Sequence, residues 1–171
     1  MIGSLDVFQT IQAMPTLSLT ISTQQGIAAK GRYKTRDAAA EAAERDGLDA
    51  TNTAGKKYEF GGLILKSRST EKFTYTIPIT FNQHGHFFPQ SVTTPKGFTI
   101  AADYHTHPHT IKEEGEGFSL GDEQFSLFYS RVMYVADTFS RNMYRYVPHV
   151  TQDKENEWCC GVIGDFVVRI P

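Results

Sequence analysis

The chain has 171 residues, which suits one domain or one domain with a short appendage. Hydrophobic residues make up 40% of it and charged residues 21%, so the chain can bury an ordinary core and is not expected to be disordered outside its ends. Seventeen basic and nineteen acidic side chains leave a formal charge of −2 without a long basic run, which gives no electrostatic case for a nucleic-acid partner.

Two further features of the composition concern the compartment. No stretch approaches the ~20 apolar residues of a membrane-spanning helix, and no basic region followed by an apolar core marks a secretory signal at the amino terminus. We therefore expect a protein that is soluble and cytoplasmic when synthesised and has no membrane partner. The cysteines, Cys159 and Cys160, are adjacent, which disfavours a disulfide between them and favours reduced thiols.

The first part of the chain is weakly patterned. Leu17, Leu19 and Ile21 alternate with polar residues, which predicts one short strand with a single apolar face. We therefore interpret residues 1–34 as an amino-terminal extension and expect the folded domain to span residues 35–171.

The clearest helix signal covers residues 35–46, which are rich in alanine, the best helix former. Thr35 can cap the start of this helix, Asp37 suits the positive end of its dipole, and Gly47 can end it. Residues 48–57 are polar and are expected to form a loop.

From Lys57 onward the apolar period changes from about 3.6 to about 2, which indicates strands. The predicted elements are strands over residues 58–65, 72–81 and 98–107, a helix over 122–130, a hairpin of 132–137 and 142–147, and a last strand over 161–170. Pro89 and Pro95 mark residues 84–96 as loop. Together these elements predict an α+β domain with a mixed, mostly antiparallel sheet flanked by helices.

The segment 104–108, Tyr-His-Thr-His-Pro, carries the clearest chemical signal. Side chains two apart on a strand share a face, so His105 and His107 can reach one ion. Pro108 cannot donate to a strand ladder and is expected to end the strand, leaving the histidines at its rim. Asp122, in the first turn of the next helix, can add a carboxylate oxygen. Three protein ligands leave a fourth tetrahedral position open, which is typical of catalytic zinc.

A catalytic zinc site also needs a general base. Bound zinc lowers the pKa of a water towards ~7, and a nearby carboxylate must take the proton and return it to the leaving amine. The candidate is Glu59, the lone carboxylate that opens an otherwise apolar predicted strand. Gly61 and Gly62 follow it and would permit close backbone approach at this point.

These residues carry a family resemblance. An upstream glutamate on a strand, then His-x-His-Pro and then Ser-x-x-Asp, resembles the JAMM motif of the JAB/MPN metalloproteases, which implies their cytidine-deaminase-like fold. The resemblance implies that His105, His107 and Asp122 bind Zn2+. It also implies that Glu59 handles the proton and that Ser119 stabilises the tetrahedral intermediate. The implied reaction is hydrolysis of a peptide, isopeptide or related amide bond in a protein or peptide substrate.

The surrounding pattern resembles a bacterial branch found at the carboxyl ends of RHS-type polymorphic toxins. The shared features are an alanine-rich helix, Tyr-Glu-Phe-Gly-Gly at 58–62 and an aromatic strand at 73–76, and the resemblance covers residues 35–148. A toxin domain would imply an immunity protein as a partner and export without a signal peptide. Ten residues separate Pro108 from Ser119, a longer loop than in the family, which could form a substrate-gating flap.

Other interpretations of these residues stay open. Ser119-Leu-Gly-Asp122 is also a helix capping box, and His109 continues the alternation and could be a third nitrogen ligand. A cupin-like metal enzyme has His-x-His followed by a glutamate, here Glu113, but needs an all-β chain. An amidohydrolase-type barrel needs around 200 residues, and only 64 follow His107. A non-catalytic MPN-like binding module that lost its activity is the remaining alternative.

Overall fold

The computed structural model describes residues 24–29, 31–81, 87, 89–108, 117–148, 151–152, 158–159 and 165–171. Within these residues the helices are α1 (Arg36–Thr53), α2 (Leu120–Tyr129) and the short 3-10 helix η1 (Pro89–Ser91). The strands are β1 (Gln24–Gln25), β2 (Gly61–Ser67), β3 (Phe73–Tyr75), β4 (Val92–Thr93), β5 (Phe98–His107), β6 (Met133–Asp137), β7 (Asn142–Tyr146), β8 (Thr151–Gln152), β9 (Trp158–Cys159) and β10 (Asp165–Arg169). No helix in this part of the chain is long and apolar enough to cross a membrane.

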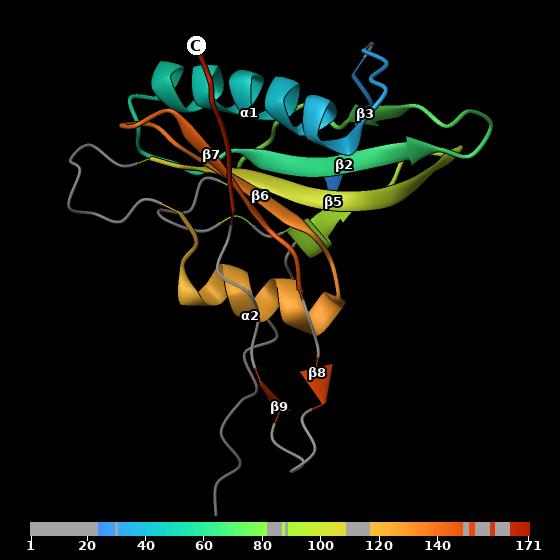
Figure 1. The fold of residues 1–171 in the computed structure, drawn as a ribbon. Helices are drawn as coiled ribbons and strands as arrows, with labels where there is room; N and C mark the ends of the chain where they lie inside the picture. The colour runs from blue at the N-terminus through green and yellow to red at the C-terminus, as the bar shows by residue number, and fades with distance from the viewer. Residues whose placement is uncertain are drawn as a thin grey trace, which may run out of the picture.

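Six of the described strands form the central sheet, in the order β10-β7-β6-β5-β2-β3. Neighbouring strands are antiparallel except β5 and β6, which are parallel and are joined through α2. Helix α1 lies over one face of the sheet and α2 over the other (Figure 1). The prediction of an α+β domain with a mixed, mostly antiparallel sheet between helices is therefore confirmed.

The side chains of β6 show how the sheet separates the two helices. Tyr134 and Ala136 belong to the core beneath α1, whereas Met133 and Val135 pack with Phe125 of α2. Because successive side chains on a strand point to opposite faces, β6 contributes side chains to the core beneath α1 and to the packing against α2. Each helix then needs only one apolar stripe to be held in place.

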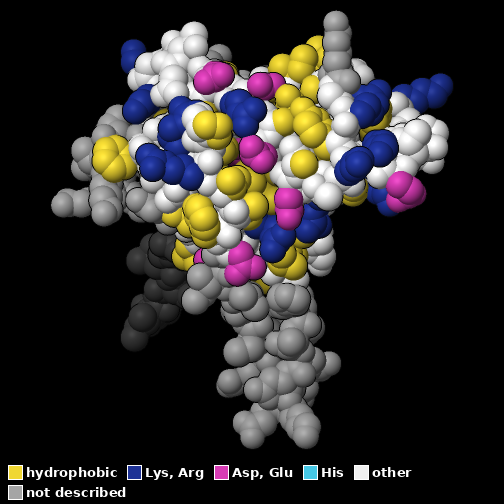
Figure 2. Space-filling view, turned by 45° about the horizontal axis from the view of Figure 1, so that its top comes forward, with side chains coloured by type: hydrophobic (Ala, Val, Ile, Leu, Met, Phe, Trp, Pro, Cys, Tyr) yellow, Lys and Arg dark blue, Asp and Glu magenta, His cyan; other side chains and the backbone are white. Residues whose placement is uncertain are grey.

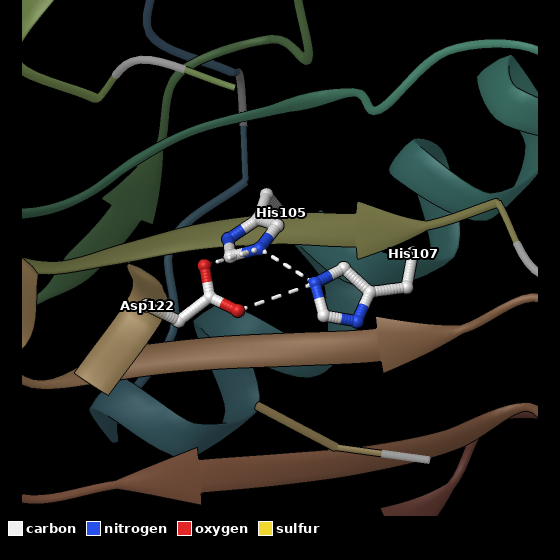
Figure 3. Close-up of side chains that lie close together, drawn as sticks. All are labelled: His105, His107 and Asp122. Atoms are coloured by element: carbon white, nitrogen blue, oxygen red, sulfur yellow. Dashed lines mark hydrogen bonds and ion pairs between the residues drawn. The ribbon is translucent and has the colours of Figure 1, made fainter. Parts of the chain in front are cut away.

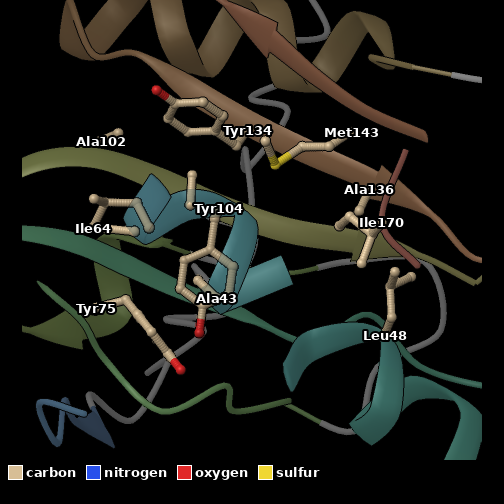
Figure 4. Packing of buried hydrophobic residues seen from close by; sticks show 12 residues of the cluster. Ala43, Leu48, Ile64, Tyr75, Ala102, Tyr104, Tyr134, Ala136, Met143 and Ile170 are labelled. Carbon is tan, nitrogen blue, oxygen red and sulfur yellow. The ribbon is translucent and has the colours of Figure 1, made fainter. Parts of the chain in front are cut away.

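The main core lies between α1 and the sheet (Figure 4). Its fully buried members are Ala39, Ala40, Ala43, Leu48, Ile64, Ala102, Tyr104, Tyr134, Ala136, Met143 and Ile170. The small side chains on α1 allow the helix to approach the sheet closely, and the large tyrosines of β5 and β6 fill the remaining volume. This packing holds β5, the strand with the two histidines, against a rigid support.

Helix α1 begins where it was predicted to begin but ends later. Thr35 is the N-cap, and its hydroxyl accepts a hydrogen bond from the Ala38 amide at 3.1 Å. The predicted end at Gly47 is wrong, since the helix continues to Thr53, and of the loop predicted over 48–57 only residues 54–57 lie outside the helix. Gly47 is buried, and a Cβ at that position would meet Thr106 Cγ2 at 2.9 Å. The glycine therefore permits close packing of α1 on β5 and does not stop the helix.

The strand predictions succeed best at the site. Strand β5 covers the predicted residues 98–107, and the β6–β7 hairpin is also confirmed. The strand predicted over 72–81 is shorter, because β3 ends at Tyr75 and Pro78 removes a backbone donor just beyond it. Beyond β3, isolated bridges join Thr76 to Ala28 and Ile79 to Gly61.

Three other predictions change or cannot be compared. The predicted loop over 84–96 contains η1 and β4 in its described part. Of the last predicted strand, the described residues 165–169 are β10. The strand predicted around residues 17–21 lies outside the described residues. Two later residues of the same predicted extension do contact the domain, since Tyr33 forms a bridge to Phe73 of β3 and Ala28 forms one to Thr76.

Candidate metal centre

Three side chains predicted as metal ligands converge at one end of the β5–β6 pair (Figure 3). His105 and His107 project from β5, and Asp122 projects from the first turn of α2. The two histidine Nε2 atoms are 3.1 Å apart. Asp122 Oδ1 lies 3.1 Å from His105 Nε2, and Asp122 Oδ2 lies 3.3 Å from His107 Nε2. The carboxyl ends of parallel strands are a common place for ligand sites in sheets that carry helices on both faces.

These separations fit a metal ion. Bonds of ~2.0–2.1 Å to a tetrahedral ion place two ligand atoms about 3.3 Å from each other. The three measured distances of 3.1, 3.1 and 3.3 Å are close to that value. His105 and His107 are only 3% and 6% exposed, so the ion would be held away from bulk solvent on the protein side. The group could therefore hold a metal ion without rearrangement of the strand or the helix.

The start of α2 directs the Asp122 carboxylate at the histidines. Ser119 is the N-cap of the helix, and its hydroxyl accepts a hydrogen bond from the Asp122 amide at 3.3 Å. In return, Asp122 Oδ2 accepts hydrogen bonds from the Ser119 amide at 2.8 Å and the Ser119 hydroxyl at 2.7 Å. The two interpretations of Ser-x-x-Asp are therefore compatible, because the capping box fixes the carboxylate while leaving it in reach of both rings.

The charges of the site are strongly coupled. Burial lowers the pKa of His105, but Asp122 outweighs this effect and, with smaller contributions from Glu59 and Asp103, the pKa rises to about 9. Burial has the opposite effect on the pKa of Asp122, which the two histidines nevertheless hold well below its usual range. The metal-free site thus keeps a proton on His105 beside an ionised carboxylate, and a bound cation would replace that proton.

Glu59, the predicted general base, lies just before β2 and not on the strand where it was expected. It is 8% exposed and its charge raises the pKa of His105, so it lies near the site without belonging to the ligand group. The close backbone approach predicted here is confirmed. Gly61 is paired with His105 across the β2–β5 ladder, and a Cβ on Gly61 would meet His105 Cβ at 2.7 Å.

Two residues near His105 were not predicted from the sequence. The Phe87 ring stacks on the His105 ring, with centroids 6.2 Å apart and planes at 21°. Asp103 is fully buried two residues before His105, and Arg131 Nη1 lies 3.1 Å from its carboxylate. Burial raises the pKa of Asp103 to about 6, and Arg131 opposes this. Alternation on β5 could have indicated Asp103, but no local pattern connects Phe87 with the site.

The opposite side of the molecule has a different character. Figure 2 is turned so that the α1 side comes forward, and acidic and basic side chains are interspersed on the face it shows. Among the described residues no histidine is visible on this face, in agreement with the burial of His105 and His107. The candidate metal centre lies on the α2 side of β5, where Asp122 projects from α2.

Comparisons of the chain with protein-family models, with curated proteins and with solved structures find no match. The motif and its geometry are therefore the features that point to a function. The helices α1 and α2 disagree with the all-β chain that a cupin requires. His109 and Glu113, the alternative ligands, lie outside the described residues.

Proposed function

We propose that the chain is a JAMM-type zinc hydrolase with an MPN/JAB-like fold, which cleaves a peptide, isopeptide or related amide bond. The observation that carries the proposal is the spacing of three ligand atoms, two from His105 and His107 and one from Asp122, at 3.1 to 3.3 Å. Two histidines and one carboxylate are a known ligand set for hydrolytic zinc. The same set also binds non-haem iron, so the metal has to be identified by experiment.

The protein's own residues divide the work in this proposal. His105, His107 and Asp122 hold the ion, and bound zinc would supply a Lewis acid that polarises the carbonyl of the scissile bond. Glu59 accepts a proton from the attacking water and returns it to the leaving amine. It is a nearly buried carboxylate whose charge raises the pKa of His105. Asp103 also raises that pKa, but its carboxylate is paired with Arg131. Ser119, which is exposed, turns its hydroxyl from Asp122 towards the substrate oxygen.

The resemblance to the carboxyl-terminal domains of RHS-type toxins extends this proposal to biology. A bacterial effector with this activity would act on a protein or peptide of a target cell and would be neutralised by an immunity protein in the producing cell. The exposed end of the site between β5 and α2 is where such an inhibitor would act. Co-purification with a small neighbouring-gene product would support this extension.

The hydrolase proposal is tested with Glu59→Gln. Zinc-loaded wild-type protein is incubated with a panel of peptide amides and isopeptide-linked protein dimers, and products are identified by mass spectrometry. We expect cleavage by the wild type, and a rate at least about 100-fold lower for Glu59→Gln with unchanged zinc content. Glu71→Gln, the same change at an exposed carboxylate that pairs with Lys66, should behave as wild type. Full activity of Glu59→Gln would contradict the assignment of the base, and zinc binding without any cleavage would favour the binding module.

A further inference from the structure

Thr106 stands between the two histidine ligands on β5 and belongs to the opposite face of the sheet. It is fully buried beneath α1, where its hydroxyl lies 2.6 Å from the hydroxyl of Thr51. The same Thr106 oxygen accepts a hydrogen bond from the Phe60 amide at 3.1 Å. The residue between the ligands is thus joined to α1 and to the residue that follows Glu59.

The hydrogen bonds of this group form one consistent set. The Thr106 hydroxyl also lies 3.3 Å from the Phe60 carbonyl oxygen and can donate to it. Between the Thr51 and Thr106 hydroxyls either oxygen can be the donor, and the Phe60 amide donates to the Thr106 oxygen. The Phe60 carbonyl also accepts from the Thr106 amide at 2.9 Å. Both polar backbone groups of Phe60 are therefore bound to Thr106.

The neighbouring residue is fixed as well. Gly61 is paired with His105 on the ladder and is bound on its other side to Ile79, with N–H to O distances of 3.0 and 2.9 Å. Glu59 is followed by two residues that are bound to β5: Phe60 is hydrogen-bonded to Thr106, and Gly61 is paired with His105. Its carboxylate is nearly buried and its charge reaches His105, so a shift of Phe60 would move the carboxylate relative to the metal ligands.

We propose that Thr106 is a positioning residue for Glu59: through its hydroxyl it ties the Glu59–Phe60 segment to α1 and to the ligand strand. This inference rests on the proposed function. Metal binding alone does not require a hydroxyl between the two histidines, whereas the positioning of Glu59 does. The hydroxyl lies on the face of β5 opposite the two imidazoles, against Thr51 and Phe60, so its removal should disturb the base and spare the ligands.

The test compares Thr106→Val, which removes the hydroxyl at nearly constant volume, with Thr106→Ser, which keeps it. Thr74→Val is the matched control, because Thr74 is also buried in the sheet and donates from its hydroxyl to the Ala29 carbonyl at 3.0 Å, away from the site. Thr51→Val is a second, milder variant, which removes the α1 hydroxyl that contacts Thr106 and leaves β5 unchanged. Each protein is loaded with cobalt(II), whose visible absorption reports the groups around the ion.

We expect every variant to bind one cobalt ion per chain. The Thr106→Val spectrum, followed from pH 5 to 9, should move towards that of Glu59→Gln, while Thr106→Ser and Thr74→Val match the wild type. Amide hydrogen exchange at Phe60 should be up to about tenfold faster in Thr106→Val, as loss of one hydrogen bond allows. On a cleaved substrate, kcat should fall about 10- to 100-fold with KM unchanged.

A Thr106→Val protein with the wild-type cobalt spectrum and kcat would overturn the inference, even with faster exchange at Phe60, because that hydrogen bond would then be structural only. A wild-type protein that binds no cobalt contradicts the metal centre itself and this inference with it. That result is read before any variant is compared, so the two failures are distinct. Rescue by Thr106→Ser supports the hydroxyl as the positioning group.

Discussion

Gly61 stands directly opposite His105 in the β2–β5 pair, at a distance that leaves no room for a side chain. A Cβ on Gly61 would meet His105 Cβ at 2.7 Å and lie closer still to the Tyr104 carbonyl oxygen. The absence of a side chain is therefore a condition for the ligand strand to pair with β2 at this point. It also brings the Glu59 segment alongside the histidines.

The first prediction concerns this contact. Gly61→Ala should lower the free energy of unfolding by about 1–3 kcal/mol, because the strands must separate to admit the methyl group. Urea denaturation monitored by circular dichroism measures the change. Gly121→Ala is the matched control, since a Cβ there meets only Ser119 Oγ at an ordinary 3.6 Å. Equal stability of Gly61→Ala and wild type would show that the close approach is not required.

The second prediction separates the two roles of the capping box. Ser119→Ala removes the N-cap of α2 and should cost about 1 kcal/mol of unfolding free energy while zinc stays bound. Asp122→Ala removes the cap partner and the carboxylate together, so it should lose both stability and zinc. Chemical denaturation and metal analysis on the same samples provide the comparison. Loss of zinc from Ser119→Ala would mean that the serine is needed to hold the ligand itself.

The third prediction is a pH dependence of metal binding. The pKa of His105 is raised to about 9 in the metal-free site, after Asp122 outweighs the effect of burial. Below that pH a metal ion has to displace the proton, so the zinc affinity should rise about tenfold per unit between pH 6 and 8. Calorimetric titrations in buffers of different ionisation enthalpy should show about one proton released per zinc at pH 7. Affinity that is constant over this range would contradict the coupling.

The fourth prediction concerns Glu44, a fully buried carboxyl on α1 whose oxygens make no hydrogen bond of normal geometry with the described residues. Burial raises its pKa well above the usual value, and the backbone of His105 only partly opposes this. The folded-state pKa thus exceeds the unfolded one, so this group's contribution to stability is greatest at low pH and is lost as the pH rises. Glu44→Gln should therefore flatten the decline in stability between pH 5 and 7.5. If the stability of the variant and of the wild type changed with pH in the same way, Glu44 would not have the raised pKa that its burial implies.

The sequence predicts the parts of this structure that depend on local patterns. The alternation around His105 and His107 gave the correct bounds of β5, and Thr35 correctly marked the start of α1. The prediction that Gly47 ends α1 is wrong because its role depends on Thr106, a residue of β5 that contacts this position only in the folded chain. A glycine after an alanine-rich stretch has the same local signature whether it caps a helix or admits a strand.

Contacts between distant residues account for most of what the sequence does not predict. The Tyr134 hydroxyl accepts a hydrogen bond from Arg36 Nε at 3.0 Å and donates to Asp37, while Arg145 Nη1 lies 2.9 Å from the same aspartate. These residues fix the start of α1 on β6 and β7, although between 97 and 108 positions separate the two partners of each contact in the sequence. At the site, Phe87 and Thr51 act through packing and hydrogen bonds of the same long-range kind.

We propose that His105, His107 and Asp122 hold one zinc ion. Mass-spectrometric metal analysis of protein purified without added metal or chelator tests it directly, on the wild type, His107→Ala and Asp122→Ala, with His84→Ala as a control outside the motif. We predict about one zinc per chain for the wild type and the control, and much less for the other two variants. Wild-type protein without bound metal, or with iron in place of zinc, would contradict the proposed zinc site.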